Sequence, residues 1–399
     1  MRGMSGESVQ QPSPHPSARQ LREVAGYFLK LGFVAFGGPA AHIAMMDQEV
    51  VQKRKWVTRE EFLDLLGAAN LIPGPSSTEL AIYLGRVRAG WRGPILAGAC
   101  FILPAMLIVL GLAVVYKRFG ALPEVGWLLY GVKPAIIAII AQALVGLGRT
   151  AVKGPLTAVV GVAAAVLSLL GVNLPLLLGA SGLLTLAAAR IRNSSARLAG
   201  VGVAPVLLAP TSVALNITVG AGAAPTSLWL LTSVFLKVGA ILFGSGYVLL
   251  AFLRADLVQH YGWLTDQQLI DAIAVGQVTP GPVFTTATFI GYLVAGTPGA
   301  LLATLGIFLP SFVLVAATYR IIPKLRASPW AAGFLDGVNV ASLGLMAVVT
   351  WHLGRAALVD AVTVGTAIVA AALLFRFRMN TAWLVLGGAL VGVAAHLLG

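Results

Sequence analysis

Sequence motifs of the first half of the chain recur in the second half at an almost constant spacing. Phe28-Leu29-Lys30-Leu31-Gly32 corresponds to Phe235-Leu236-Lys237-Val238-Gly239, and Pro73-Gly74-Pro75 corresponds to Pro280-Gly281-Pro282, each 207 positions later. After a one-residue slip, Leu103-Pro104 corresponds to Leu309-Pro310. Because these matches keep one order over about 110 positions, chance does not explain them, and the chain consists of two copies of one folding unit.

Each unit is too apolar for a water-soluble domain. Hydrophobic residues make up 58% of the 399 residues and charged residues 10%, against roughly 25% charged in a typical soluble domain. Residues 94–116 and 154–189 contain no charged side chain, and a spanning helix needs about 20 mostly apolar residues. The composition therefore excludes an ordinary cytosolic enzyme, a nucleic-acid-binding protein and a disordered protein, and it predicts an all-α polytopic membrane protein.

Hydropathy predicts a similar set of helices in both units. The segments apolar enough to span a membrane are 94–116, 125–148, 154–189 (as two short helices turning at Val172-Asn173-Leu174-Pro175), 299–319, 332–354, 356–375 and 379–398. Two further apolar segments, 21–46 and 228–253, open the units. We expect a polar tail (1–20), a first membrane repeat (21–190), a linker (191–226) whose residues 198–215 are apolar enough to enter the membrane, and a second membrane repeat (227–399).

The distribution of basic residues predicts a broken, re-entrant hairpin in each unit. Basic clusters lie on both sides of residues 60–85, whose centre is Pro73-Gly74-Pro75. Since basic loops face the cytoplasm, this segment is expected to enter the membrane and return at the Pro-Gly-Pro motif. The alternative is that the segment crosses the membrane twice, which leaves both basic clusters on the same side. About five spanning helices plus one hairpin per unit give two inverted-topology repeats.

The same count predicts orientation. With the N-terminus outside the cell inner membrane, 17 of the 27 Lys and Arg residues fall in inside loops and 7 in outside segments. This bias supports inversion, and it assigns the net charge of +13 to cytoplasmic loops rather than to nucleic-acid binding.

Inverted repeats with broken helices are typical of secondary transporters, whose substrates bind where the repeats meet. A half-helix follows each Pro-Gly-Pro motif, and a helix N-terminus offers unpaired N–H groups and a partial positive charge to an anion. Lys30 and Lys237 add full charges from the opening helices, and a glycine break follows each lysine. The predicted substrate-binding residues are Lys30, Gly37, Gly38, Pro73, Gly74, Pro75, Ser76, Ser77, Thr78, Lys237, Gly244, Ser245, Pro280, Gly281, Pro282, Thr285 and Thr286.

Ionisable residues near these breaks are candidates for proton coupling, namely Asp64, Glu79, Asp271 and His42. Simpler interpretations stay open. Lys30 can snorkel to the interface, Glu79 has capping-box spacing from Ser76, both aspartates can lie in the solvated interface, and a lone histidine is usually structural. Because intramembrane charges are expensive, Lys133 is expected to pair with Asp336 across the repeat interface.

Motifs of catalysis and cofactor binding are missing from the sequence. There is no phosphate loop, no HExxH motif, and no Ser-His-Asp arrangement with access to water. The only cysteine, Cys100, excludes a disulfide framework and a thiolate metal cluster. We therefore expect no enzymatic activity, no cofactor and no metal site.

At Phe36-Gly37-Gly38-Pro39 with His42, and at the two Pro-Gly-Pro motifs, the sequence resembles the chromate ion transporter family of the long-chain, two-domain type. The resemblance covers roughly residues 20–398. It implies efflux of chromate from the cytoplasm, chromate resistance, and competition by sulfate, a tetrahedral dianion of similar size. The second copy differs at Gly244-Ser245-Gly246 and has Leu249 in place of His42.

Export of a dianion from a negative-inside cell is electrically downhill by about 2.3 kcal/mol per charge per 100 mV. Membrane potential or proton exchange is therefore the expected driving force. Two alternatives stay open: uptake of sulfate or another oxyanion through the same site, and a structural or lipid-handling membrane protein. The partners expected are chromate, sulfate and the lipid bilayer, with a homodimer left open and no nucleic acid.

Overall fold

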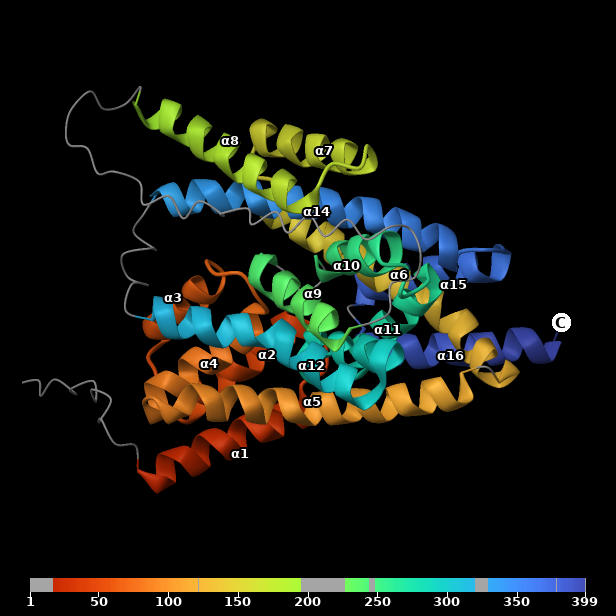
Figure 1. The fold of residues 1–399 in the computed structure, drawn as a ribbon, viewed down its shortest axis with the longest axis horizontal. Coiled ribbons are helices and arrows are strands. Elements are labelled where there is room, and N and C mark those ends of the chain that lie inside the picture. The colour runs from red at the N-terminus through yellow and green to blue at the C-terminus, as the bar shows by residue number, and fades with distance from the viewer. Residues whose placement is uncertain are drawn as a thin grey trace, which may run out of the picture.

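The computed structural model describes residues 17–120, 122–194, 227–243, 248–319, 329–377 and 379–398, and these contain helices and no strands. The predictions that fall on the tail up to residue 16, on 195–226 with its segment 198–215, and on Gly244, Ser245 and Gly246 lie outside the described residues. Figure 1 shows long helices such as α5 (Arg92–Phe119) and α14 (Pro329–Ala357) running roughly along the longest axis of the molecule.

The first repeat is built from helices in the predicted order. After α1 come α2 and a π-helical turn, η1, then the two arms of a hairpin and four apolar helices. Their bounds are α1 Ala18–Val34, α2 Gly38–Met46, η1 Asp47–Lys53, α3 Arg59–Ala69, α4 Ser76–Ala89, α5 Arg92–Phe119, α6 Pro123–Ala151, α7 Pro155–Leu169 and α8 Leu174–Ser194.

The second repeat follows the same plan. One helix, α12, takes the place of both α4 and α5, and non-helical backbone at Ala295 and Gly296 divides it at the point where α4 and α5 separate. The bounds are α9 Leu228–Ile241, α10 Leu249–Leu253, η2 Arg254–His260, α11 Asp266–Val278, η3 Val283–Thr285, α12 Thr286–Thr318, α14 Pro329–Ala357, α15 Ala361–Phe377 and α16 Thr381–Leu398.

Two sequence predictions about helix boundaries are tested here. The turn predicted near residues 172–175 is confirmed, because α7 ends at Leu169 and α8 begins at Leu174. The glycine break predicted after Lys30 is also confirmed. The backbone of the opening segment 21–46 breaks between α1 and α2, where Gly37 and Gly38 have φ of 102° and 74°, values that glycine adopts at little cost.

Matching local signals start the first arm of each hairpin. Thr58 accepts a hydrogen bond from the Glu61 N–H while the Glu61 side chain accepts one from the Thr58 N–H, and this capping box begins α3. Thr265 and Gln268 form the equivalent box at α11. Such a box satisfies two backbone donors that the first turn of a helix leaves unpaired. The two repeats therefore share the signals that begin individual helices as well as the order of those helices.

Small residues let helices of the two repeats approach closely. Gly131 in α6 lies against the backbone of Gly388 in α16, and its counterpart Gly337 in α14 lies against Ser181 in α8. In each repeat, the second long helix, α6 or α14, thus packs against the last helix of the other repeat. Close backbone contact through small residues is how membrane helices associate.

Four described helices are long and apolar enough to cross a membrane: Arg92–Phe119, Pro123–Ala151, Val283–Thr318 and Ala332–Ala357. Shorter apolar helices accompany them, among them α7, α15 and α16. Large apolar side chains such as Leu107 (59% exposed) and Leu305 (56% exposed) face outward from the spans. Outward-facing leucines in the charge-free middle of these helices are what a lipid-facing surface requires, so the chain is a multi-pass membrane protein.

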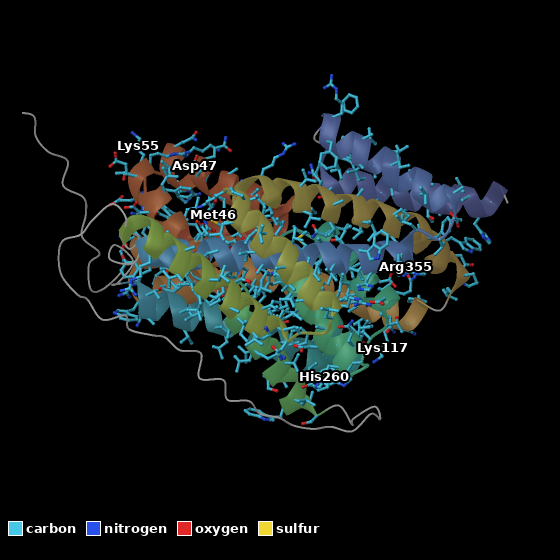
Figure 2. The ribbon with its side chains drawn as sticks, turned by 90° about the horizontal axis from the view of Figure 1, so that it is seen from above. Met46, Asp47, Lys55, Lys117, His260 and Arg355 are labelled. Carbon is cyan, nitrogen blue, oxygen red and sulfur yellow. The ribbon has the colours of Figure 1, made fainter. Side chains whose placement is uncertain are left out.

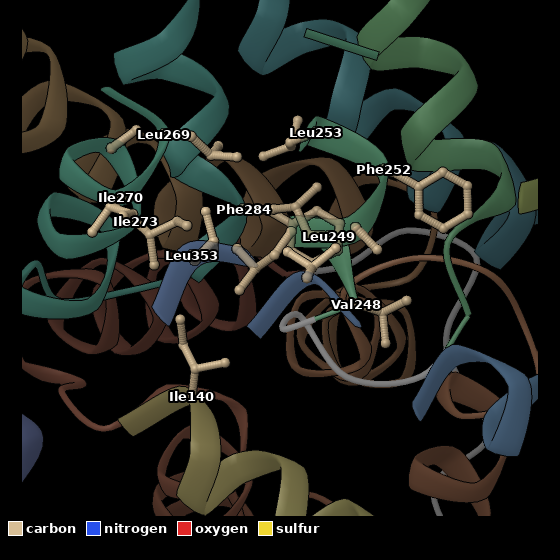
Figure 3. Packing of buried hydrophobic residues seen from close by; sticks show 14 of the residues in the cluster. Ile140, Val248, Leu249, Phe252, Leu253, Leu269, Ile270, Ile273, Phe284 and Leu353 are labelled. Atoms are coloured by element: carbon tan, nitrogen blue, oxygen red, sulfur yellow. The ribbon is translucent and has the colours of Figure 1, made fainter. Parts of the chain in front are cut away.

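The largest buried apolar cluster lies mainly in the second repeat. It joins α6, α9, α10, α11, α12 and α14, and Figure 3 shows Leu249 and Leu253 packing near Phe284 and Leu353. This packing fixes α11 and the start of α12, the two arms of the second hairpin.

Candidate functional site

The two Pro-Gly-Pro tips each bind the other repeat. The Gly74 N–H donates a hydrogen bond to the Leu242 carbonyl at the end of α9, over 2.7 Å, and the Gly281 N–H donates one to the Ala35 carbonyl at the end of α1, over 2.9 Å. Gly281 is 207 positions after Gly74, and Leu242 is 207 positions after Ala35. The exchange is therefore reciprocal, as a two-fold relationship between the repeats demands.

Both tip glycines occupy places where a side chain does not fit. Gly74 has φ of 137° and Gly281 has φ of 89°. A methyl group on Gly74 would collide with the carboxylate of Glu79 and the hydroxyl of Ser311, and one on Gly281 would collide with the Ala105 side chain. Ala105 and Ser311 are equivalent positions of the repeat. Backbone conformation and space thus both require glycine.

His42 connects the first tip with the second. Its ring is fully buried, and Nε2 lies 3.1 Å from the Ala35 carbonyl oxygen, the acceptor that Gly281 also uses. A carbonyl only accepts, so Nε2 carries the proton and Nδ1 of the neutral ring accepts from the Ser77 hydroxyl at 3.3 Å. Phe101 packs edge-on against the ring. Both ring nitrogens are engaged, as the structural interpretation of His42 expects.

Polar atoms without partners gather at the start of α4. Thr78 and Glu79 are fully buried. The Ser311 hydroxyl donates to Glu79 Oε1 over 3.2 Å, while Glu79 Oε2 and Thr78 Oγ1 have no hydrogen-bond partner in the described part of the chain. Buried polar atoms of this kind are rare in native proteins and call for an explanation.

The capping interpretation of Glu79 is wrong. The N-cap of α4 is Pro75, and no side chain makes a cap hydrogen bond there. The Thr78 and Glu79 N–H groups reach back to the Pro75 carbonyl, at 2.8 and 3.1 Å. The N–H groups of the first turn, at Ser76 and Ser77, are of the kind that a helix leaves unpaired.

The second hairpin presents fewer free groups. The Thr285 hydroxyl donates to the Pro282 carbonyl and the Thr286 hydroxyl to the Val283 carbonyl, both over 2.8 Å. Thr286 stands where the first repeat has Glu79. Pro280 and Pro282 flank the tip as Pro73 and Pro75 do. The two half-helices are thus alike in backbone and different in chemistry.

A buried ion pair joins α11 to the first repeat. Lys133 in α6 places its ammonium 3.2 Å from Asp271 Oδ1, and the Tyr116 hydroxyl donates to Asp271 Oδ2 over 2.8 Å. Lys133 also donates to the Gln267 side-chain oxygen over 2.7 Å. The predicted pairing of Lys133 with Asp336 is wrong, because Asp336 pairs with Lys153 over 2.7 Å. The expectation that Lys133 pairs across the repeats is met by a different aspartate.

The structure does not bring the other predicted charges into the buried cluster. Asp64, the counterpart of Asp271, is exposed, whereas Asp271 is 3% exposed. Lys30 is exposed on the face of α1 that carries Phe33. Lys237 is also exposed and pairs with Asp256 over 2.7 Å. In contrast, Gly37 and Gly38 lie at the α1–α2 break beside Ala35.

Sequence reasoning missed the partners of the ionisable residues. Ser311 comes directly after Leu309-Pro310, which corresponds to Leu103-Pro104 in the first repeat. The second repeat therefore has the Ser311 hydroxyl where the first repeat has the methyl group of Ala105. That difference between the repeats was a usable signal. Tyr116 and Gln267 carried no comparable signal, since their contacts with Asp271 and Lys133 depend on tertiary packing.

Within the described residues, no group of His, Cys, Asp and Glu is placed to hold a metal ion. A duplicated helical membrane protein in which each broken hairpin bonds the opening helix of the other repeat, beside buried polar groups, has the organisation of a membrane transporter. The chromate transporter family model matches residues 22–186 and 229–393, one match in each half. The chain belongs to the chromate transporter family.

Curated relatives extend over nearly the whole chain. The chromate transport protein of Cupriavidus metallidurans is 35% identical over 387 residues, covering 94% of this chain and 93% of the relative. The probable chromate transport protein of Synechococcus elongatus is 35% identical over 87% of both chains. The chromate transport protein of Pseudomonas aeruginosa is 31% identical over 97% of this chain and 94% of the relative. No solved structure matches the chain.

Proposed function

We propose that this chain is a secondary transporter that exports chromate from the cytoplasm across the cell inner membrane and so gives chromate resistance. The names of its relatives support the substrate. The anion passes where the two Pro-Gly-Pro tips meet, beside the predicted residues of α4 and α12.

The two repeats are proposed to lie in inverted orientation, with the N-terminus outside. The reciprocal bonds of Gly74 with Leu242 and of Gly281 with Ala35 support a two-fold axis between the repeats. With an odd number of crossings per repeat, this axis lies in the plane of the membrane. Transporters that alternate access around a fixed site have this arrangement.

The observation that carries the proposal is the set of free polar groups at the start of α4. Thr78 Oγ1 is buried without a partner among the described residues, and it lies in the first turn of α4, whose N–H groups receive no side-chain cap. Neutral donors at a helix N-terminus suit an oxyanion that must also be released, because they hold it less tightly than several full charges would.

Glu79 gives this anion site its coupling group. As a carboxylate, it would repel the dianion, and with Oε2 buried and unpartnered it would be costly to keep charged. In its neutral form, it removes the repulsion and can donate a hydrogen bond. Binding of chromate and protonation of Glu79 are therefore linked, so a proton that binds with the anion leaves with it, and membrane potential acting on the remaining negative charge drives export by this route. Asp271 is the second coupling candidate, and His42 the third.

The experiment is uptake of labelled chromate into energised everted membrane vesicles, with sulfate as competitor. Uptake above that of empty vesicles, reduced by sulfate, is expected. The roles of Lys30 and Lys237 stay predictions, and Lys30→Met and Lys237→Met test them in the same assay. Uptake only into right-side-out vesicles would replace export by import of an oxyanion, and no chromate flux in either orientation would remove the chromate function.

A further inference from the structure

Polar side chains line the contact between α4 of the first repeat and the last part of α12 of the second. The Ser311 hydroxyl donates to Glu79 Oε1 over 3.2 Å. Tyr83 is four residues after Glu79, on the same face of α4, and its hydroxyl lies 2.8 Å from that of Thr318. The α4–α12 polar line consists of Glu79, Tyr83 and Arg86 from α4 and of Ser311, Thr318 and Tyr319 from the end of α12.

The inner end of this line is closed to water. Glu79 and Tyr83 are fully buried, and Glu79 Oε2 has no hydrogen-bond partner in the described part of the chain. The charge of the carboxylate acts on the Tyr83 hydroxyl, so the two groups interact. Since Oε1 accepts from Ser311, Oε2 is the carboxyl oxygen that is free to bind a proton.

The outer end of the line reaches the surface. Thr318 and Arg86 are only partly buried, and Arg86 Cζ lies 5.4 Å from the centre of the Tyr319 ring, which ties the end of α4 to the end of α12. Figure 1 shows α5, which begins directly after α4, starting at one end of the molecule. Figure 2 shows Lys55 at that end, away from Lys117. The line thus leads from the buried carboxyl to the end whose basic residues predict a cytoplasmic position.

The matching positions of the other copy lack these groups. The counterparts of Glu79, Tyr83, Arg86, Ser311, Thr318 and Tyr319 are, in that order, Thr286, Ile290, Leu293, Ala105, Leu112 and Ala113. Only Thr286 among them is polar, and its hydroxyl donates to the Val283 carbonyl of the same hairpin. Packing of two similar repeats does not require polar groups at one set of positions and apolar groups at the other. The difference indicates a task that only the α4–α12 contact performs.

Other ionisable groups near the line have different positions or partners. His42 contacts the start of α4, and both of its ring nitrogens are engaged. Arg88 pairs with Glu23 over 2.6 Å. Glu61 of α3 interacts electrostatically with Tyr319 at the outer end. Among the described residues, the buried carboxyl of α4 is therefore the acid that the inner end of the line reaches.

We propose that the α4–α12 polar line is the route by which protons reach Glu79 from the cytoplasmic side, with Thr318 as the outer and Tyr83 as the inner relay residue. The inference rests on the proposed function, which makes Glu79 the coupling group. Proton and chromate then load from the same side, as their joint export requires.

The relay conserves every hydroxyl. A proton from water adds to the Thr318 oxygen, which passes its own proton to the Tyr83 oxygen. Tyr83 in turn releases its proton, through a water molecule, to Glu79 Oε2, and both hydroxyls rotate back. Arg86 keeps its charge throughout; its stacking on the Tyr319 ring holds α4 and α12 in register, so it acts by position.

The test follows the exchange of the Glu79 proton without transport. The purified full chain is transferred from H₂O to D₂O, and infrared spectroscopy measures the deuteration of the carboxylic acid band that Glu79→Gln removes. We expect Tyr83→Phe, which keeps the ring, and Thr318→Val, which keeps the branched shape, to slow deuteration at least about tenfold. Tyr27→Phe is the control and is expected to keep the rate, because it removes the hydroxyl of another buried tyrosine, which donates to the Met45 carbonyl.

Three results would overturn the proposal. One is an equal rate of deuteration in the wild type, Tyr83→Phe and Thr318→Val. Another is faster deuteration in Tyr83→Phe, which would show that this hydroxyl only holds the contact closed. The third is the absence of a band that Glu79→Gln removes at every pH at which the protein stays folded. Chromate flux separates the two claims: flux by the wild type with unchanged deuteration in the variants contradicts the route, and slowed deuteration without any wild-type flux contradicts the transport function.

Discussion

Gly281 donates its backbone N–H to the carbonyl of Ala35, joining the tip of the second hairpin to the end of the first opening helix over 2.9 Å. The equivalent bond from Gly74 to Leu242 joins the first tip to the second opening helix. Each hairpin therefore depends on the other repeat for its position. A movement of one repeat against the other must break or shift both bonds, which places the movable contacts of the protein at the proposed anion site.

Gly74→Ala is expected to abolish transport and to destabilise the protein. Positive φ costs a non-glycine residue roughly 1–2 kcal/mol, and the added methyl group also collides with Glu79 and Ser311. Gly171→Ala is the control, because Gly171 has φ of 83° and open space around its Cα. Thermal unfolding in detergent and chromate uptake measure the two effects. Equal behaviour of the two variants would show that the crowding at Gly74 is unimportant.

His42→Leu converts the first repeat to the residue of the second and is expected to destabilise the protein by about 2 kcal/mol. The change removes the partner of Ser77 and one of the two donors to the Ala35 carbonyl, and buried groups left unpaired cost about 1–3 kcal/mol each. Denaturation of the purified protein measures the loss. An unchanged stability would argue against His42 as a link between the tips.

Glu79→Gln keeps an oxygen for the Ser311 hydroxyl and removes the titratable group. If Glu79 carries the coupling proton, chromate flux driven by a pH gradient falls by at least about tenfold, while binding persists, because the neutral amide resembles the protonated acid. Glu124→Gln, at an exposed position of α6, is the control. Proton-driven flux at the wild-type level in Glu79→Gln would exclude the role.

Lys133→Met is expected to cost roughly 3–5 kcal/mol, because it leaves the Asp271 carboxylate buried without its cation. Adding Asp271→Asn should recover much of this loss. Lys153→Met breaks the more exposed pair with Asp336 and should cost no more than about 1 kcal/mol. The melting temperatures of the three variants measure these losses of stability. A large effect at Lys153 and none at Lys133 would contradict the buried pair of Lys133 with Asp271.

Features repeated in the sequence were predictable. Two Pro-Gly-Pro tips, the capping box of Thr58 with Glu61, and the break after α1 all follow from local rules, and the fixed offset transfers most of them to the second repeat. What could not be predicted depends on contacts between distant segments. The partner of Lys133 is 138 positions away in the chain, and only the packing of α6 on α11 selects Asp271 over Asp336.

The two repeats also differ where function needs asymmetry. Glu79 and His42 have Thr286 and Leu249 as counterparts, and the buried Asp271 has the exposed Asp64. Spacing identified Glu79 and His42 as unequal to their counterparts, whereas the different burial of Asp64 and Asp271 depends on tertiary packing. It did not show that Glu79 would lack a cap role, because capping-box spacing is also found where another residue, here Pro75, begins the helix.

The most direct test of the account is labelled chromate uptake into everted vesicles by the wild type, Gly281→Ala, and Gly281→Ala with Ala105→Gly, at equal protein levels. The methyl group on residue 281 collides with the side chain of Ala105, so the single variant should lose uptake. Removing the Ala105 side chain should restore part of it. Full uptake by Gly281→Ala would contradict the claim that chromate crosses the membrane where the two tips meet.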